Sequence, residues 1–200
     1  RGYHDYEIAR YAQLLLGFQL PEYLLFAALA FTVQVVANQK YLGLLATLVA
    51  YFLIVFSSYI GVEHKLLVFS ASPAWYFTDM RVFVGSAGPW VWFKLYWAGW
   101  ALLLALVARL LWVRGKDDAF RTRLRIARLR FDRATAAIAA VTVALVLGLG
   151  GFVFYNTNVL HEYITGDEMV ERRAEYERRY GKFEGIPQPQ PTATHLRIEL

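Results

Sequence analysis

The sequence contains no cysteine. Disulfide bonds, thiolate catalysis and cysteine-ligated metal sites are therefore excluded for this chain. Charged residues are also few, at 18% of the 200 residues, and residues 41–60 contain none. Because a charged side chain is costly in hydrocarbon but not at its boundary, long uncharged segments are typical of membrane proteins.

Hydrophobic residues are abundant, and the basic residues are concentrated in one place. The chain is 58% hydrophobic and 16% aromatic, more than a typical soluble domain. Eight lysines and arginines fall between Arg114 and Arg133. A basic cluster between two apolar segments is typical of a cytoplasmic membrane anchor rather than of a nucleic-acid-binding surface. We therefore expect the lipid bilayer as a partner and no nucleic acid.

Four apolar segments predict an all-α membrane protein with about four transmembrane helices. The predicted spans cover residues 20–37, 41–60, 90–112 and 136–155, within a membrane domain over 19–155. Residues 1–18 carry apolar side chains at helical spacing among charged ones, which predicts an interfacial helix. A soluble helix before the first span is the alternative for this segment.

The basic cluster predicts the orientation of the spans. Loops rich in lysine and arginine stay in the cytoplasm, so residues 114–135 should be cytoplasmic and should lie on an anionic leaflet. Spans alternate, so the turn at Lys40 is expected on the same side, with loop 61–89 and the chain after Tyr155 outside. The arginines expected to form the cytoplasmic basic surface are Arg121, Arg123, Arg125, Arg128 and Arg130.

Two sets of residues inside the predicted spans invite a functional interpretation. Gln34 and Asn38 lie one turn apart in the first span, so they either line a polar pathway or make hydrogen bonds between helices. In the last span, small residues four apart form a stripe that lets another helix approach closely, unless it reflects only the alanine-rich composition. This stripe consists of Ala136, Ala140, Ala144 and Gly148.

The residues after the last span predict an extramembrane tail. Thr165 followed by Glu168 is a capping-box pattern, so an extracytoplasmic helix is expected within residues 156–185. Residues 186–200 read as a proline-rich linker and one strand, and a strand needs partners to bury its apolar face. The chain also begins without methionine or a signal-peptide pattern. We therefore expect a piece of a longer protein, truncated in the first strand of a β domain.

No catalytic constellation is visible in the sequence. His161-Glu162 begins like the HExxH motif of zinc peptidases, but the fifth residue is Thr165 and no second histidine is near. These residues are better interpreted as polar groups just outside the last span. No Walker-type nucleotide loop is present either. We predict no catalytic residue, metal ligand or cofactor site within this chain.

Several stretches together resemble one protein family, the bacterial fusion of a type-2 ABC transporter permease with an aminopeptidase N-like (gluzincin) zinc metallopeptidase. The stretches are NQKYLG (38–43), YFTDM (76–80), WxRG (112–115), RxRLRxAR (121–128), FYNTNVLHEY (154–163) and YERRYGKFEGIPQP (176–189). The sequence departs from the family at TDMRVFVG, where a glycine-rich, asparagine-containing run is expected after the Asp-Met. The zinc site and the Gly-x-Met-Glu-Asn stretch of the family do not occur in the chain, so no catalytic residue is carried over.

The resemblance implies the end of a permease followed by the start of a peptidase in the bacterial inner membrane. It implies a separate ATP-binding subunit, further permease helices from the same or a second chain, and zinc in the downstream domain. The membrane part would then form a transport path or a coupling element. Two alternatives remain open: a degenerate permease that only anchors the peptidase, and a stand-alone membrane interaction protein.

Overall fold

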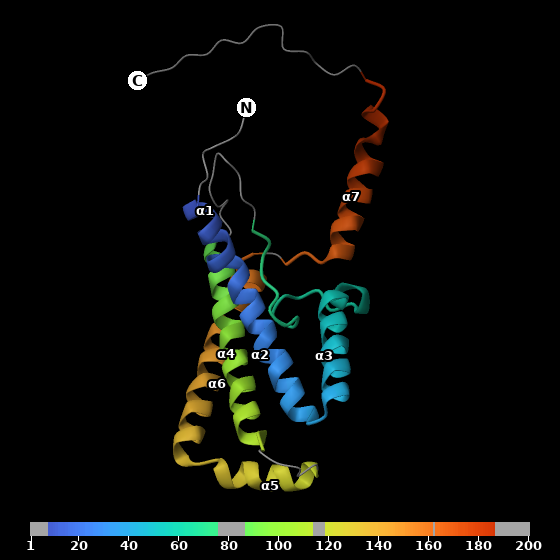
Figure 1. Cartoon of the computed structure of the whole chain (residues 1–200). Coiled ribbons are helices and arrows are strands. Elements are labelled where there is room, and N and C mark those ends of the chain that lie inside the picture. Colours follow the sequence, from blue (N-terminus) through green and yellow to red (C-terminus); the bar gives the residue numbers. More distant parts are fainter. Residues whose placement is uncertain (1–7, 76–86, 114–118, 162, 187–200) are drawn as a thin grey trace, which may run out of the picture. The chain divides into compact units, whose positions relative to one another are not determined.

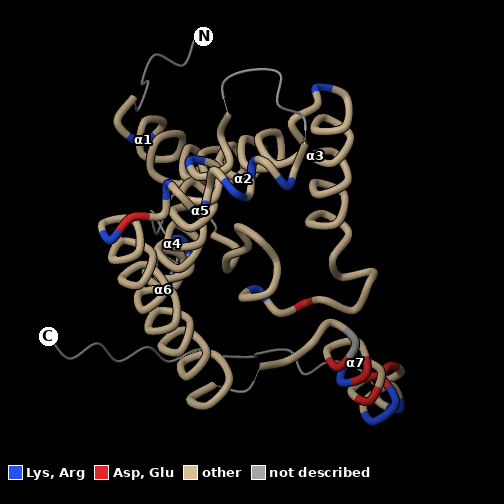
Figure 2. Tube along the Cα trace, turned by 90° about the horizontal axis from the view of Figure 1, so that it is seen from below, with Lys and Arg blue, Asp and Glu red and all other residues tan. Residues whose placement is uncertain are grey.

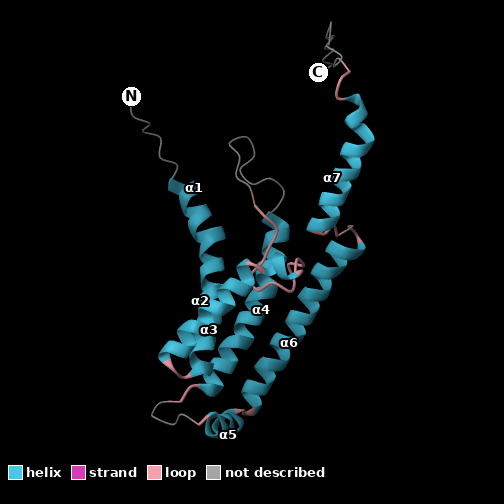
Figure 3. Ribbon diagram, turned by 90° about the vertical axis from the view of Figure 1, so that its right-hand side faces the viewer, coloured by secondary structure: helices cyan, strands magenta, loops and turns pink. Residues whose placement is uncertain are grey.

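The computed structural model describes residues 8–75, 87–113, 119–161 and 163–186. These residues form helices, turns and irregular segments, and no strand occurs among them (Figure 3). The chain divides into two units, one ending at Tyr163 and the other beginning at Ile164. Each unit is described by itself below. The linker and strand predicted over 186–200 lie, from residue 187 on, outside the described residues.

The described part of the first unit starts with one long helix, which joins residues 8–18 of the predicted interfacial segment to the first predicted span without a break; residues 1–7 of that segment lie outside the described residues. The α-helix α1 (Ile8–Ala12), the π-helical η1 (Gln13–Gln19) and α2 (Leu20–Ala37) are continuous. In the widened η1 turn, the Leu20 N–H donates to the Leu15 carbonyl, five residues back. Pro21 follows directly, and its ring has no N–H and crowds the preceding turn. The π turn therefore lets the helix run through the proline.

The second predicted span, residues 41–60, is only partly helical. Asn38 closes α2 in the left-handed conformation, with φ of 50°, and α3 (Lys40–Val55) runs back beside α2 (Figure 1). The 16 residues of α3 span about 24 Å, less than the ~30 Å of a bilayer core. A single 3₁₀ turn, η2 (Ser57–Ile60), then closes at Gly61.

Three helices of the described residues are long and apolar enough to cross a membrane: Ile8–Ala37, Ala87–Leu111 and Arg133–Val159. The last of these joins α6 (Arg133–Phe154) to the π-helical η3 (Tyr155–Val159). The helix α4 (Ala87–Leu111) is central, because it contacts both α2 and α6. Leu25, Tyr96, Trp97 and Val146 form the core between these three helices.

Side chains of α4 hold the segment after Gly61 against the bundle. The Lys94 ammonium donates to the Ser70 carbonyl at 2.7 Å, and the Trp97 indole donates to the Ala71 carbonyl at 2.9 Å. Lys94 is only 6% exposed and also pairs with Glu22 of α2 at 3.2 Å. Irregular backbone beside a membrane helix needs such partners, because lipid offers no hydrogen bonds. The pairing therefore fixes α2, α4 and this segment to each other.

The second unit contains α7 (Gly166–Tyr180) and a 3₁₀ turn, η4 (Gly181–Phe183). The predicted capping box is confirmed: the Thr165 side chain accepts from the Glu168 N–H, and the Glu168 carboxylate accepts from the Thr165 N–H. Glu168 also pairs with Arg172 at 3.7 Å, four residues on. Acidic and basic residues alternate along α7 (Figure 2), as is typical of a solvated helix.

The close approach of α4 and α6 at Gly99 generates the first prediction. A Cβ added to Gly99 would lie 2.6 Å from Val146 Cγ2, whereas one added to Gly148 would meet nothing within 4 Å. Gly99→Ala should lower the free energy of unfolding by about 1–3 kcal/mol through overpacking, whereas Gly148→Ala should not lower it. Denaturant titration of the detergent-solubilised protein measures both. Val146→Ala should relieve the Gly99→Ala defect, and failure of this rescue would contradict the contact.

Candidate functional site

The basic segment forms a short helix, α5 (Phe120–Arg130), that lies across the end of α4 (Figures 1 and 3). It follows α4 in the chain and precedes α6, to which it is joined through Phe131 and Asp132. The structure thus places the basic residues at the same end of the bundle as the turn between α2 and α3. This agrees with the alternation of spans expected from the sequence.

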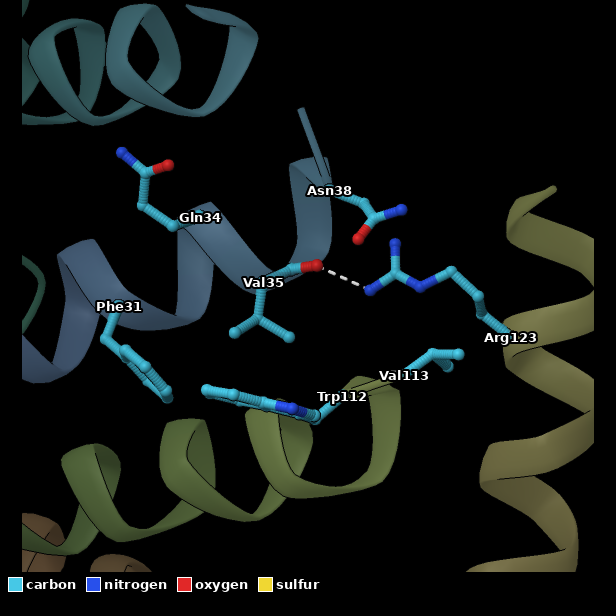
Figure 4. A pocket seen from close by; sticks show the side chains of 7 residues that line it. All are labelled: Phe31, Gln34, Val35, Asn38, Trp112, Val113 and Arg123. Atoms are coloured by element: carbon cyan, nitrogen blue, oxygen red, sulfur yellow. Dashed lines mark hydrogen bonds between the residues drawn. The ribbon is translucent and has the colours of Figure 1, made fainter. Parts of the chain in front are cut away.

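Arg123 is the residue that attaches α5 to the bundle. It is 2% exposed, and its guanidinium donates to the Leu111 carbonyl from Nε at 3.3 Å and from Nη2 at 2.9 Å. It also donates to the carbonyls of Val36, at 3.1 Å, and Val35 (Figure 4). These carbonyls lie in the last turns of α4 and α2, where no further N–H of the helix can reach them and the helix dipole is negative. One cation therefore caps two helices.

The five predicted arginines do not share one surface. Arg121, Arg125 and Arg128 are exposed, whereas Arg123 is buried; the cytoplasmic location of this basic loop remains a prediction. Arg130 is exposed and donates to the Trp112 carbonyl. One feature of the sequence indicates which face of α5 is buried. Ala127 lies one turn after Arg123, is buried as well, and is small enough for α5 to lie close to the helix ends.

Gln34 and Asn38 have structural roles that explain their positions. The Gln34 side chain extends toward α3 (Figure 4) and occupies the space where a Cβ on Gly43 would lie. The Asn38 N–H donates to the Gln34 carbonyl at 3.0 Å while Asn38 turns the chain. Both residues line a hollow of about 320 Å³ together with Arg123. A transport path through them remains a prediction.

A second hollow, of about 740 Å³, lies between α4 and α5. It shares the rings of Phe31 and Trp112, whose centroids are 5.3 Å apart, with the first hollow. Arg109 of α4 and Arg130 of α5 are its charged residues. The remaining lining is apolar.

Asp132 fixes the start of α6 beside this second hollow. Its carboxylate accepts from the Thr135 N–H at 2.8 Å, which makes Asp132 the N-cap of α6. These hydrogen bonds with Thr135, helped by the positive charge of Arg109, hold the pKa of the Asp132 carboxyl below its usual value. The carboxylate is thus kept ionised where the partial positive charge of the helix N-terminus favours it.

At the opposite end of the bundle, His64 joins the segment after Gly61 to the end of the last long helix. Its Nδ1 accepts from the Leu66 N–H at 3.2 Å, so Nε2 carries the proton and donates to Asn158 Oδ1 at 3.0 Å. His161, which the sequence analysis interpreted as a polar residue just outside the last span and not as a zinc ligand, is exposed, and its Nδ1 lies 2.8 Å from the Asn156 carbonyl. Within the described residues, no three histidine, aspartate or glutamate side chains are grouped to hold a metal ion.

The small-residue stripe of α6 does not face α4. Ala140, Ala144 and Gly148 are exposed and Ala136 is half-buried. The buried residues of α6 are instead Thr135, Thr142, Val146 and Val153. Packing of the stripe against another helix remains a prediction, and the partner helix would come from outside the described residues.

The sequence interpretation did not single out the Lys94–Glu22 pair as a site. A signal was present, because Glu22 is the sole charged residue of the predicted span 20–37, and Lys94 and Arg109 are the charged residues of the predicted span 90–112. Opposite charges in neighbouring membrane helices tend to pair.

Replacement of Arg123 generates the second prediction. In Arg123→Lys the charge stays, but one ammonium cannot reach the carbonyls of both α2 and α4 as the planar fork does. The loss of charge-assisted hydrogen bonds should lower the free energy of unfolding by about 2–4 kcal/mol. Arg125→Lys, on the exposed side of α5, should change it by less than about 0.5 kcal/mol. Equal effects of the two substitutions in denaturant titrations would contradict the capping role.

Comparison with known proteins adds no assignment to this geometry. No family model, curated protein or solved structure matches the chain. Function is therefore inferred from the helix ends capped by α5, together with the sequence motifs.

Proposed function

We propose that this chain is part of the membrane domain of an ABC-type permease, in which α5 receives a separate ATP-binding subunit. The observation that carries the proposal is the capping of α2 and α4 by Arg123. A subunit that pushes or tilts α5 would pull on the ends of both helices. The RxRLRxAR resemblance over residues 121–128 supports the same assignment.

The connections of α5 suit a coupling element. Charge-assisted hydrogen bonds join it to α2 and α4, and these bonds are about twice as strong as neutral ones. The chain itself joins α5 to α6 at the Asp132 cap. One helix of 11 residues is thus connected to the ends of the three helices, among the described residues, that are long enough to cross a membrane.

The outer side of α5 offers a surface for such a subunit. Leu129 is 82% exposed, and Arg121, Arg125 and Arg128 are exposed on the same short helix. An apolar residue among arginines suits a partner surface with an apolar pocket and acidic rim. The chain itself shows no nucleotide loop, so ATP would bind to the partner.

The finer parts of the proposal rest on the motif resemblance. They are a fourth span formed with α3, the bacterial inner membrane, and an extracytoplasmic tail that leads into a β domain of a zinc peptidase. The pairing of His64 with Asn158 supports an outer end at which loop and tail meet. A permease reduced to an anchor for the peptidase is the rival, and it requires no subunit on α5.

Single cysteines test the orientation, and the cysteine-free sequence makes each label unique. Leu129→Cys in the full-length protein should react with a membrane-impermeant maleimide only in inverted vesicles. Tyr176→Cys on α7, where the side chain is also exposed, should react in intact cells. The measurement is gel-shift labelling in the native membrane. Reaction of Leu129→Cys in intact cells would place α5 outside and overturn the proposal.

The same variant distinguishes coupling from anchoring. A bulky maleimide on Leu129→Cys should block the ATP-binding subunit, so co-purification of that subunit and its stimulated ATPase should fall at least tenfold. Peptidase activity measured on the same sample reports folding of the remainder. An unchanged ATPase rate after complete labelling would favour the alternative in which the permease only anchors the peptidase.

A further inference from the structure

The hollow between α4 and α5 combines two cations with apolar walls. Arg109 and Arg130 come from different helices, and the other lining includes Phe31, Ala105, Trp112 and Ile126. Both arginines are exposed. Arg130 donates to the Trp112 carbonyl from Nη1, and a guanidinium carries four further N–H donors. Donors remain for a ligand at this position.

The position of the hollow along α4 indicates the environment of that ligand. Arg109 lies in the last turn of α4, which ends at Leu111, and Trp112 follows directly. Arginine and tryptophan at the end of a long apolar helix are typical of the membrane–water boundary. A ligand there would contact water and lipid headgroups beside the two arginines, and hydrocarbon along the apolar wall of the hollow.

We propose that this hollow binds the phosphate of an anionic phospholipid, with the start of an acyl chain against the apolar wall. Two arginines can share the phosphate oxygens in bidentate fashion, and basic recesses between membrane helices suit anionic headgroups. The Asp132 carboxylate is the opposing charge near Arg109, and it is occupied by the Thr135 cap. Among the residues that the structure describes, two cations face this one acid, so their charges sum to a net positive hollow.

Lipid in this hollow would strengthen the attachment of α5. Arg109 belongs to α4 and Arg130 to α5, so a shared phosphate bridges the two helices beside the Arg123 cap. Anionic lipid should then stabilise the α5-docked form of the bundle. This inference does not depend on an ATP-binding subunit, and it holds equally for a permease and for an anchor.

The experiment adds lipids to the delipidated full-length protein in neutral detergent. Phosphatidylglycerol should raise the midpoint of thermal unfolding in a saturable manner, whereas phosphatidylcholine should not. Arg109→Gln combined with Arg130→Gln should weaken the apparent affinity for phosphatidylglycerol about thirtyfold, because two interfacial arginines are lost. Arg121→Gln combined with Arg125→Gln removes the same charge outside the hollow and should leave the affinity within about twofold.

A second variant keeps the proposal testable if the arginine variant unfolds. Ala105→Phe places a bulky ring against the apolar wall of the hollow with both arginines in place, and it should reduce the lipid-dependent shift while the lipid-free midpoint stays near that of the wild type. Three outcomes would overturn the proposal. Inorganic phosphate that stabilises as well as the lipid would indicate a free-anion site. Equal weakening by the Arg121/Arg125 control would indicate general surface attraction, and an undiminished shift in Ala105→Phe would place the lipid elsewhere.

Discussion

The buried guanidinium of Arg123 is the interaction on which the arrangement of the helix ends depends. A buried cation is costly unless its donors are satisfied, and here the acceptors are helix carbonyls that would otherwise lack partners. The carbonyls offset the cost of burying the guanidinium, and the guanidinium offsets the cost of burying the carbonyls. A lysine could neutralise one helix end, but the fork of arginine reaches α2 and α4 together. The position of α5, and with it the start of α6, follows from this contact.

At the opposite end of α4, backbone carbonyls also receive their hydrogen bonds from side chains, but here the side chains belong to α4 itself. There the unpaired carbonyls belong to an irregular segment, and Lys94, Tyr96 and Trp97 of α4 donate to them. Lys94 also pairs with Glu22 of α2 in this buried position. Helix α4 is thus bound to α2 by one cation at each end, Arg123 near its C-terminus and Lys94 near its N-terminus. In the apolar region between them, Thr32 donates to the Leu104 carbonyl.

The features that could be predicted from the sequence are those determined by residues close together in the chain. Long apolar segments indicated the three long helices, and the Thr165–Glu168 spacing predicted the cap of α7, because both depend on near neighbours in the chain. The end of α3 at Val55 and the continuous helix through Pro21 depend on turn geometry that hydropathy does not record. The role of Arg123 was hidden for another reason. Five arginines on one short helix look alike until the helix ends that one of them caps are placed in space.

The packing of the three long helices decides what a movement of α5 can do. Helix α4 contacts both α2 and α6, but α2 and α6 make no contact with each other among the described elements. Their relative position is therefore set through α4, through α5 at one end, and at the other end through the segment after Gly61, which His64 joins to Asn158. A tilt of α5 would displace the end of α2 through Arg123 and the start of α6 through the Asp132 junction. Among the described residues, α2 and α6 share no helix–helix interface that would oppose such a displacement at the α5 end.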